Sequence, residues 1–315
     1  MSDPDVLVLR QTIHGSDASD LVASLRERLP DQEIALARTP AEERELIATA
    51  RVAVGLHIDE ELLAAAEELE LFACVFAGTG HLPSDALADR GVAVTNASGV
   101  HGPNIAEYVV GSMITHARQW PRAHRQKAER EWRTYETTEV YGSTVAVVGL
   151  GAIGRTVLDR LKSFDVDTVG VRYSPEKGGP ADAVYGFDEF HEAIADAEYV
   201  VIACPLTETT RGMVDAEALK TMRADAVLIN IARGPIVDTD ALVSSLRNSR
   251  IRGAALDVTD PEPLPEDHPL WGLGNVTITP HNAGHTPHYY DRVADILAGN
   301  LDRLESGEEL ENRVV

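Results

Sequence analysis

Three polar side chains late in the sequence carry complementary chemistry: the cation Arg233, the carboxylate Glu262 and the imidazole His281. Each lies in a polar segment that follows a short apolar run. We expect those runs to be parallel strands whose carboxyl ends meet at one edge of a sheet. A guanidinium binds a carboxylate through charge-assisted hydrogen bonds, and an imidazole beside a carboxylate can transfer one proton. The chemistry of a 2-oxo acid requires such a set of groups.

A glycine motif earlier in the chain indicates a second reactant. Residues 145–148 are apolar and too few for a helix. Gly149, Gly151 and Gly154 follow in the spacing G-x-G-x-x-G, before a segment with helical spacing. Strand, glycine turn and helix in this order predict a Rossmann dinucleotide site, where free N–H groups at the helix N-terminus face a pyrophosphate. The expected cofactor-binding residues of this turn are Gly149, Gly151, Ala152, Ile153 and Gly154.

The choice of dinucleotide depends on the end of the next expected strand, 168–171, about twenty residues beyond the glycines. An aspartate at that point would accept hydrogen bonds from ribose hydroxyls and repel a 2′-phosphate. This sequence instead has Arg172, followed by Tyr173 and Ser174. A guanidinium can bind a 2′-phosphate and stack on adenine. We therefore expect these three residues to bind NADP(H) in preference to NAD(H), which remains possible.

Apolar runs alternate with segments of helical spacing along the chain, which indicates parallel α/β sheets. The expected strands of the first part are 6–9, 34–36, 52–54, 71–76 and 92–94. Those of the second part, about six, fit one doubly wound sheet and are 145–148, 168–171, 199–203, 226–229, 253–256 and 276–278. The segment 98–103 interrupts the alternation and is interpreted as a hinge. A basic stretch that contains tryptophan precedes residue 145, and a helical pattern returns at 289–304.

The charge balance restricts the partners. The chain has 51 acidic and 28 basic residues, a net charge of −23, and such a surface repels nucleic acid and anionic membranes. Because the acids are spread through periodic segments, the composition is typical of proteins from halophiles, which work in multimolar salt. No apolar run approaches the length of about 18 residues that a membrane span needs. The N-terminus lacks the features of a signal peptide, which favours the cytoplasm.

The cysteines and histidines do not predict a metal site. Cys74 and Cys204 lie in apolar runs and are expected to be reduced packing residues. His281 and His285 are four residues apart, but they fall on a glycine-containing loop with no third ligand nearby.

Several motifs together resemble the D-2-hydroxyacid dehydrogenase family, whose members are specific for the D isomer. They are the glycine motif, Asn230-x-x-Arg233-Gly234, Asp257-Val-x-x-x-Glu262-Pro-Leu and Thr279-Pro-His281-x-Ala-Gly284. Pro205-Leu-Thr-x-x-Thr210-Arg-Gly is similar to a cofactor loop of that family, and Ala77-Gly78-Thr79-Gly80 to its substrate loop. The matches extend from residue 77 to residue 284.

The resemblance implies an α/β protein of two domains. A Rossmann domain with a doubly wound parallel sheet would bind the cofactor and comprise 98–287. A smaller flavodoxin-like α/β domain, formed by 1–97 and 288–315, would bind the substrate. The family also implies a homodimer paired through the cofactor domains, and NAD(P)-dependent reduction of a 2-oxo acid to a D-2-hydroxy acid.

The resemblance also implies roles for single residues. His281 would contact the substrate as general acid in reduction and general base in oxidation, and Glu262 would favour its protonated form. Arg233 would bind the substrate carboxylate and polarise the carbonyl, while backbone N–H groups of Gly78 and Thr79 would hold the other carboxylate oxygen. Further cofactor residues would be Pro205, Thr210, Ala232 and Asp257, the last on the nicotinamide carboxamide. Thr259 replaces an aromatic residue of many relatives, a departure that affects the pocket wall.

Other functions on the same fold stay open. One is an NAD(P)-sensing binding protein like the family's corepressor relatives, which the acidic chain disfavours. Another is a phosphoglycerate dehydrogenase, although many relatives of that kind carry a regulatory domain after the core. This sequence ends about thirty residues after the His281 loop. Formate dehydrogenase relatives have glutamine in place of Glu262, which makes that activity a weaker candidate.

Overall fold

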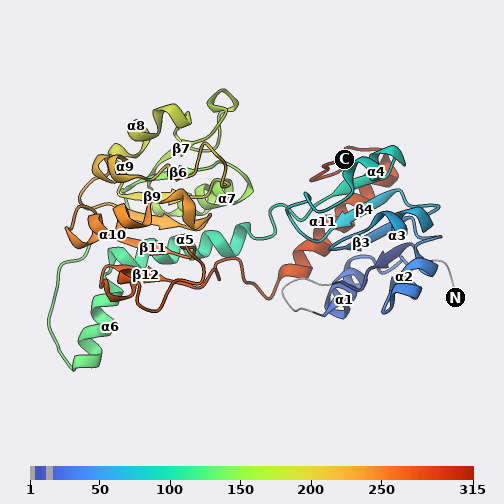
Figure 1. Cartoon of the computed structure of the whole chain (residues 1–315), viewed down its shortest axis with the longest axis horizontal. Coiled ribbons are helices and arrows are strands. Elements are labelled where there is room, and N and C mark those ends of the chain that lie inside the picture. Colours follow the sequence, from blue (N-terminus) through green and yellow to red (C-terminus); the bar gives the residue numbers. More distant parts are fainter. Residues whose placement is uncertain (1–3, 12–16) are drawn as a thin grey trace. The chain divides into compact units, whose positions relative to one another are not determined.

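The computed structural model describes residues 4–11 and 17–315. The chain forms two compact units (Figure 1). One contains the residues up to Val100 together with Thr286–Val315, and the other is His101–His285. The sequence prediction placed its two domain boundaries after residues 97 and 287.

The first unit is built on a five-stranded parallel sheet in the order β2-β1-β3-β4-β5. This is the flavodoxin-like strand order, in which the second strand lies outside the first. The strands are β1 (Val6–Val8), β2 (Ile34–Leu36), β3 (Val52–Gly55), β4 (Leu71–Cys74) and β5 (Ala93–Thr95). The helices are α1 (Ala18–Arg28), α2 (Pro40–Leu46), α3 (Glu60–Ala65), α4 (Ser84–Asp89) and α11 (Tyr289–Ser306).

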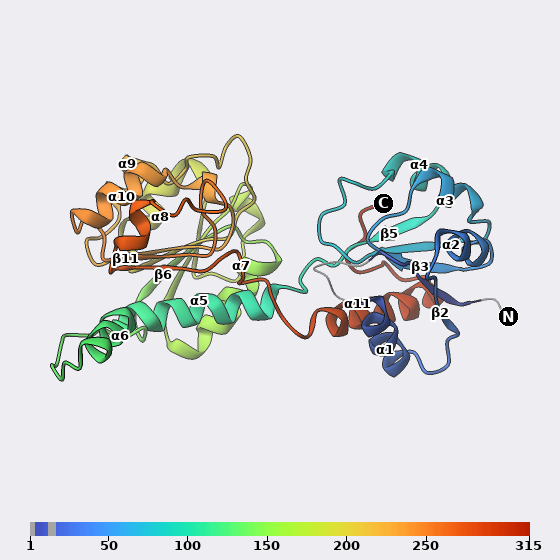
Figure 2. The ribbon, with the colours of Figure 1, turned by 60° about the horizontal axis from the view of Figure 1, so that its bottom comes forward.

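Side chains that alternate along each strand give this sheet two apolar faces. Val6 and Val8 belong to a core with α1 and α11, whereas Leu7 belongs to a core with residues of α3 and α4. Figure 2 shows these two layers of helices on opposite sides of the sheet. Helix α11 comes from the end of the chain, so the first unit is completed only by residues beyond 285.

The second unit contains a seven-stranded parallel sheet in the order β12-β11-β10-β9-β6-β7-β8. Its strands are β6 (Thr144–Val148), β7 (Asp167–Val171), β8 (Ala183–Tyr185), β9 (Tyr199–Ile202), β10 (Val227–Asn230), β11 (Gly253–Leu256) and β12 (Val276–Ile278). Its helices are α5 (Gly102–Ala117), α6 (Trp120–Glu129), α7 (Ala152–Leu161), α8 (Phe190–Ala195), α9 (Ala216–Thr221) and α10 (Thr239–Arg247). Helices α5 and α7 share one core with the sheet, and α8, α9 and α10 share the other.

The predicted fold class is confirmed: two α/β units with parallel sheets, one of them doubly wound. The prediction of about six strands in the second sheet was wrong, because β8 adds a seventh. Strand β8 is a half-buried edge strand of three residues, and its Ala-Val-Tyr sequence stands among polar residues and glycines with a single β-branched residue. Helices α4 and α6 were also missed. The sequence of α6 is mostly charged and has no apolar stripe, with Gln126 its one buried residue.

Candidate active site

The glycine motif forms the turn between β6 and α7, where the second sheet changes its winding direction. Strand β6 lies between β7 and β9. The chain first adds β7 and β8 on one side of β6, and then β9 to β12 on the other side. Gly149 has a φ of +105°, and a Cβ there would lie 2.6 Å from the backbone nitrogen of Cys204. A Cβ at Gly154 would lie 1.9 Å from the carbonyl oxygen of Gly149. Both positions therefore require glycine.

The space in front of this turn fits a dinucleotide. A Cβ at Gly151 would meet nothing within 4 Å, and helix α7 begins immediately afterwards without a side-chain cap. Its first N–H groups are therefore available to an anion. A cavity of about 500 Å³ opens beside the turn. Seven of the predicted cofactor residues line it: Gly149, Gly151, Arg172, Tyr173, Ser174, Pro205 and Thr210.

Arg172 follows β7 and lies on the wall of this cavity. Its Nη1 atom donates a 2.6 Å hydrogen bond to the carbonyl oxygen of Gly178, which fixes the guanidinium but occupies only part of its donors. The neighbouring Tyr173 ring is mostly exposed and meets Phe187 edge to face, with centroids 6.4 Å apart. A cation and two aromatic rings thus border the same end of the cavity.

Thr210 stabilises the loop on the other side of the cavity. Its buried hydroxyl donates to the carbonyl oxygen of Pro205 at 2.7 Å and accepts the N–H of Thr207 at 2.8 Å. These hydrogen bonds fix the conformation of the loop after β9. Three further residues line the cavity: Thr207, which the sequence analysis quoted in the motif without assigning it to the cofactor, and Thr209 and Phe187, which it missed. The two threonines stand inside the quoted motif 205–212, so the signal for them was present.

The Arg233 segment follows β10 and is held by Asn230, which is almost completely buried. The side chain of Asn230 accepts the N–H of Ala232 at 3.1 Å and donates to the carbonyl oxygen of Arg233 at 3.1 Å. The next position, Gly234, requires glycine because a Cβ there would lie 1.9 Å from the carbonyl oxygen of Thr259. Arg233 itself is exposed, and its Nη1 atom donates to the carbonyl oxygen of Ala232. Across the described residues, no hydrogen bond or ion pair joins Arg233 to Glu262 or His281.

Glu262 and His281 are in direct contact. The Nδ1 atom of His281 lies 3.0 Å from Oε2 of Glu262, and Oε1 of Glu262 accepts the N–H of Thr259 at 3.0 Å. Both carboxylate oxygens are therefore used, which fixes the orientation of the carboxylate. The side chain of His281 is 50% exposed and that of Glu262 is 39% exposed, so the pair faces solvent and can reach a small molecule. The predicted carboxylate and imidazole are brought together.

Asp257 lies at the end of β11 and is buried. Its Oδ1 atom accepts hydrogen bonds from the Thr279 hydroxyl at 2.5 Å and from the N–H of Asn282 at 2.8 Å. Both of its oxygens lie within 3.1 Å of the N–H of Ala283. The Asp257 carboxylate thus holds the loop that carries His281 through these hydrogen bonds, a role that the sequence prediction did not include.

A cavity of about 540 Å³ adjoins the Glu262–His281 pair. Thr259, Leu264, Trp271 and Ile278 contribute to its wall. The indole nitrogen of Trp271 donates to the carbonyl oxygen of Pro265 at 2.9 Å, which holds the ring in place. The small Thr259 side chain, which the sequence analysis placed on the pocket wall, forms part of the wall of this space.

Gly78 and Thr79 lie in the loop after β4 of the first unit. The carbonyl oxygen of Thr79 accepts the N–H of Leu82 at 3.0 Å, and Asn96 donates to the carbonyl oxygen of Ala77 at 2.7 Å. In the part of the chain that the structure describes, the N–H groups of Gly78 and Thr79 have no hydrogen-bond partner. Two adjacent free donors suit an anionic oxygen.

The remaining predictions concern metal, membrane and cysteines. Over residues 4–11 and 17–315, no group of three or more histidines, cysteines or acids is arranged to hold a metal ion. None of the described helices is both long and apolar enough to cross a bilayer. Cys74 and Cys204 are free and buried. Burial raises the pKa of Cys204 to about 11, which keeps this thiol protonated near neutral pH.

Comparisons with known proteins agree with the geometry. The family described as D-isomer specific 2-hydroxyacid dehydrogenase, NAD binding domain, matches residues 110–283. A glyoxylate reductase from Thermofilum pendens is 36% identical over 260 residues, which is 80% of this chain and 76% of the relative.

Two further relatives extend the comparison. A D-3-phosphoglycerate dehydrogenase from Methanocaldococcus jannaschii is 32% identical over 294 residues, covering 91% of this chain but only 56% of the relative, so this chain spans about half of that protein's length. A solved structure of a D-isomer specific 2-hydroxyacid dehydrogenase from Xanthobacter autotrophicus, in complex with NADPH and MES, has a TM-score of 0.76 at 29% identity. The structural alignment covers 99% of this chain and 98% of the Xanthobacter chain.

Proposed function

The chain belongs to the D-isomer specific 2-hydroxyacid dehydrogenase family, and we propose that it reduces a 2-oxo acid to a D-2-hydroxy acid with NADP(H). Members of this family are NAD(P)-dependent oxidoreductases, so the chain is an enzyme of that class. The observation that carries the proposal is the contact between His281 Nδ1 and Glu262 Oε2 at 3.0 Å. It leaves the other ring nitrogen of His281 for the substrate.

The bound nicotinamide would supply a hydride to the carbonyl carbon. His281 then donates a proton to the carbonyl oxygen, and Glu262 stabilises the imidazolium form that carries this proton. In the reverse direction the same imidazole acts as the base. Arg233 binds the substrate carboxylate and polarises the carbonyl. The free N–H groups of Gly78 and Thr79 in the first unit are proposed as donors to an anionic oxygen of the substrate.

The preference for NADP(H) rests on the cavity beside the glycine turn. Arg172 and Ser174 border this cavity just after the end of β7, where the 2′-substituent of the adenosine ribose would lie. The Tyr173 and Phe187 rings offer an apolar surface to the adenine base. The Xanthobacter relative was solved in complex with NADPH, which supports the same cofactor for this chain. Ala232 is proposed to contact the nicotinamide half. For Asp257, the contact with the carboxamide is proposed in addition to its hydrogen bonds within the protein.

The proposed assembly is a homodimer formed through the second unit. Six basic residues fall within the stretch 118–133 of this strongly acidic chain: Arg118, Arg122, Arg125, Lys127, Arg130 and Arg133. Figures 1 and 2 show α6 and the segment after it projecting from the body of this unit. Trp132, which is fully exposed, lies there beside a cavity of about 610 Å³. A cationic arm with an exposed indole suits the acidic surface of a second copy.

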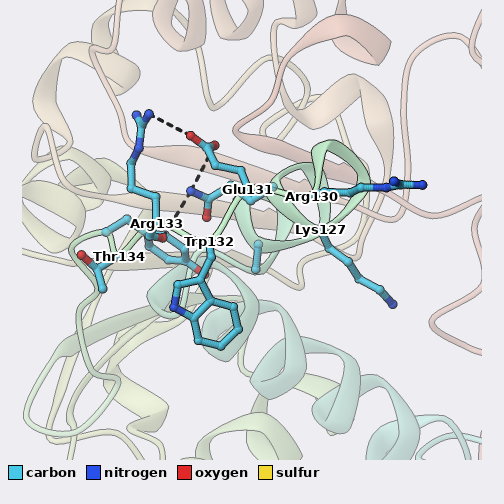
Figure 3. Close-up of a pocket in the computed structure, with 9 residues that line it drawn as sticks. Lys127, Arg130, Glu131, Trp132, Arg133 and Thr134 are labelled. Atoms are coloured by element: carbon cyan, nitrogen blue, oxygen red, sulfur yellow. Dashed lines mark hydrogen bonds and ion pairs between the residues drawn. The ribbon is translucent and has the colours of Figure 1, made fainter.

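Figure 3 shows how this arm presents its side chains: Lys127 and Arg130 extend to one side, and the Glu131–Arg133 ion pair lies on the other. The cavity contains no residue that we assign to catalysis. We therefore assign it to assembly. The same acidic composition supports a halophile's cytoplasm as the setting, because concentrated salt screens the repulsion among 51 acidic side chains.

A substrate panel in concentrated KCl tests the proposed function. Glyoxylate, hydroxypyruvate, pyruvate and 3-phosphohydroxypyruvate are each supplied with NADPH or NADH, and the chirality of the product is determined. Turnover with NADPH and a D product are expected. Strict dependence on the phosphorylated substrate would instead favour a phosphoglycerate dehydrogenase. Tight cofactor binding without turnover of any 2-oxo acid would favour a sensing protein.

A further inference from the structure

The first turns of α5, together with the residue that precedes the helix, are hydrogen-bonded to the loop that carries His281. His101, Asn104 and Tyr108 are spaced three and four residues apart, so they lie on the same side of the helix. The Nδ1 atom of His101 donates to the carbonyl oxygen of Gly284 at 2.9 Å. The side chain of Asn104 donates to the carbonyl oxygen of Ala283 at 2.7 Å. The two contacts hold the end of the loop against the first turns of the helix.

Tyr108 reaches the beginning of the same loop through Thr279. The Oγ1 atom of Thr279 lies 2.9 Å from the Tyr108 hydroxyl and 2.5 Å from Oδ1 of Asp257. Thr279 has one hydroxyl proton, and an ionised carboxylate only accepts hydrogen bonds. Thr279 therefore donates to Asp257 and accepts from the phenol of Tyr108. Burial raises the pKa of Tyr108, which keeps the phenol protonated as this arrangement requires.

Asp257 in turn determines the backbone around His281. Its carbonyl oxygen accepts the N–H of His281 at 2.8 Å, and its carboxylate accepts the N–H groups of Asn282 and Ala283. His281 has a φ of +53°, a left-handed conformation that residues other than glycine rarely adopt. Such a conformation persists only where the surroundings impose it. Here the surroundings are the hydrogen bonds that begin at Tyr108.

We propose that the α5 face formed by His101, Asn104 and Tyr108 is a positioning element for His281, in which Tyr108 acts through Thr279 and Asp257. None of the three touches the reacting atoms in this proposal. Their function is to keep the His281 backbone left-handed, so that Nδ1 stays on Glu262 and the other ring nitrogen is presented to the substrate. The inference rests on the proposed role of His281 as general acid.

Tyr108→Phe tests the proposal, because it removes one hydroxyl and keeps the ring. We expect kcat to fall about fivefold, the factor that corresponds to the net contribution of one hydrogen bond, about 1 kcal/mol, with KM for the cofactor unchanged. Thr279→Val should lower kcat further, since it leaves Asp257 without its hydroxyl donor. Thr279→Ser should restore most of that loss. Tyr289→Phe is the matched control, because its hydroxyl donates to the carbonyl oxygen of Val75 inside the first unit.

A second measurement uses the protein without substrate or cofactor. The His281 ring Cε1–H resonance, assigned by comparison with His281→Ala, should broaden or shift in Tyr108→Phe and Thr279→Val and stay unchanged in Tyr289→Phe. An unchanged resonance together with a wild-type kcat in Tyr108→Phe would overturn the proposal. If the wild type turns over no 2-oxo acid, the proposed function fails, while the resonance still decides whether Tyr108 positions His281.

Discussion

The Nδ1 atom of His281 lies 3.0 Å from Oε2 of Glu262, although the two residues are on loops after different strands. Strands β11 and β12 are neighbours in the sheet, so the loops that follow them start side by side. A carboxylate on one ring nitrogen favours the tautomer that carries a proton there, and the second nitrogen is left to exchange a proton with a ligand. This arrangement is the basis of the first prediction.

His281→Ala should lower kcat by roughly two to four orders of magnitude, the usual contribution of general acid–base catalysis. Glu262→Gln should cause a smaller loss of roughly tenfold, because it replaces a charge-assisted hydrogen bond with a neutral one. Steady-state kinetics checks both values, and NADPH binding followed by fluorescence serves as the control and should persist. Near-normal turnover in His281→Ala would remove this residue from the mechanism.

Acid should destabilise the second unit through His116, which is buried in the last turn of α5. Burial, aided by the Arg252 charge, lowers the pKa of His116 to about 4 from the ordinary 6.5 of the unfolded chain. The unfolded state therefore binds this proton first as the pH falls. The free energy of unfolding should decrease by at most about 1.4 kcal/mol per pH unit from this group between pH 6.5 and 4.

Urea denaturation of the wild type and of His116→Gln at several pH values in constant KCl measures this effect. The variant should be less stable at pH 7 but lose less stability on acidification, because it lacks the buried imidazole. Parallel stability curves for the two proteins would show that His116 is not responsible.

Salt should stabilise the fold. The chain has a net charge of −23. We expect its melting temperature to decrease when the KCl concentration is reduced below about 0.5 M, because repulsion among the surface carboxylates is then less screened. Thermal unfolding followed by circular dichroism from low to multimolar KCl provides the measurement, with sucrose as an uncharged control. A melting temperature that is constant over this range would contradict the proposed halophilic setting.

The sequence was sufficient for every described strand except β8, and for the loops that carry the proposed site. Buried strands of four or five apolar residues, such as 145–148, are readily recognised, and the motifs place Arg233, Glu262 and His281 at their carboxyl ends. Tyr108 was missed because a tyrosine in an apolar helix is ordinarily interpreted as a core residue. Its contact with Thr279 joins residues 171 positions apart, and no local pattern encodes such a pairing.

The same limit explains the double role of Asp257 and the missed helix α6. A carboxylate after a strand predicts a ligand site, but its hydrogen bonds to the backbone of residues 282 and 283 depend on how the loop after β12 folds back. The α6 sequence is mostly charged and its one buried residue is Gln126, so no stripe of large apolar residues marks this helix in the sequence.

Trp132→Ser should weaken the proposed dimer. A fully exposed indole can bury a large apolar area in an interface, and removing a tryptophan from such a contact typically weakens the affinity strongly. Sedimentation velocity in concentrated KCl should show the wild type as a dimer and the variant shifted toward the monomer at equal concentration. Val314→Ser, which alters an exposed apolar residue of the first unit, is the control. A monomeric wild type would refute the proposed assembly.

Cofactor choice should depend on Arg172. Its guanidinium is held by the carbonyl oxygen of Gly178 at 2.6 Å and keeps donors for a 2′-phosphate, while an aspartate at this position would repel that group. Hydrogen bonds to a charged group contribute about 1.5–3 kcal/mol, so kcat/KM for NADPH should exceed that for NADH by roughly tenfold to a hundredfold. Arg172→Asp should remove or reverse this ratio. Arg160→Asp, on the exposed surface of α7, changes the net charge equally and should leave the ratio intact. If Arg172→Asp keeps the wild-type ratio, Arg172 does not discriminate between the cofactors and the proposed NADP preference loses its main support.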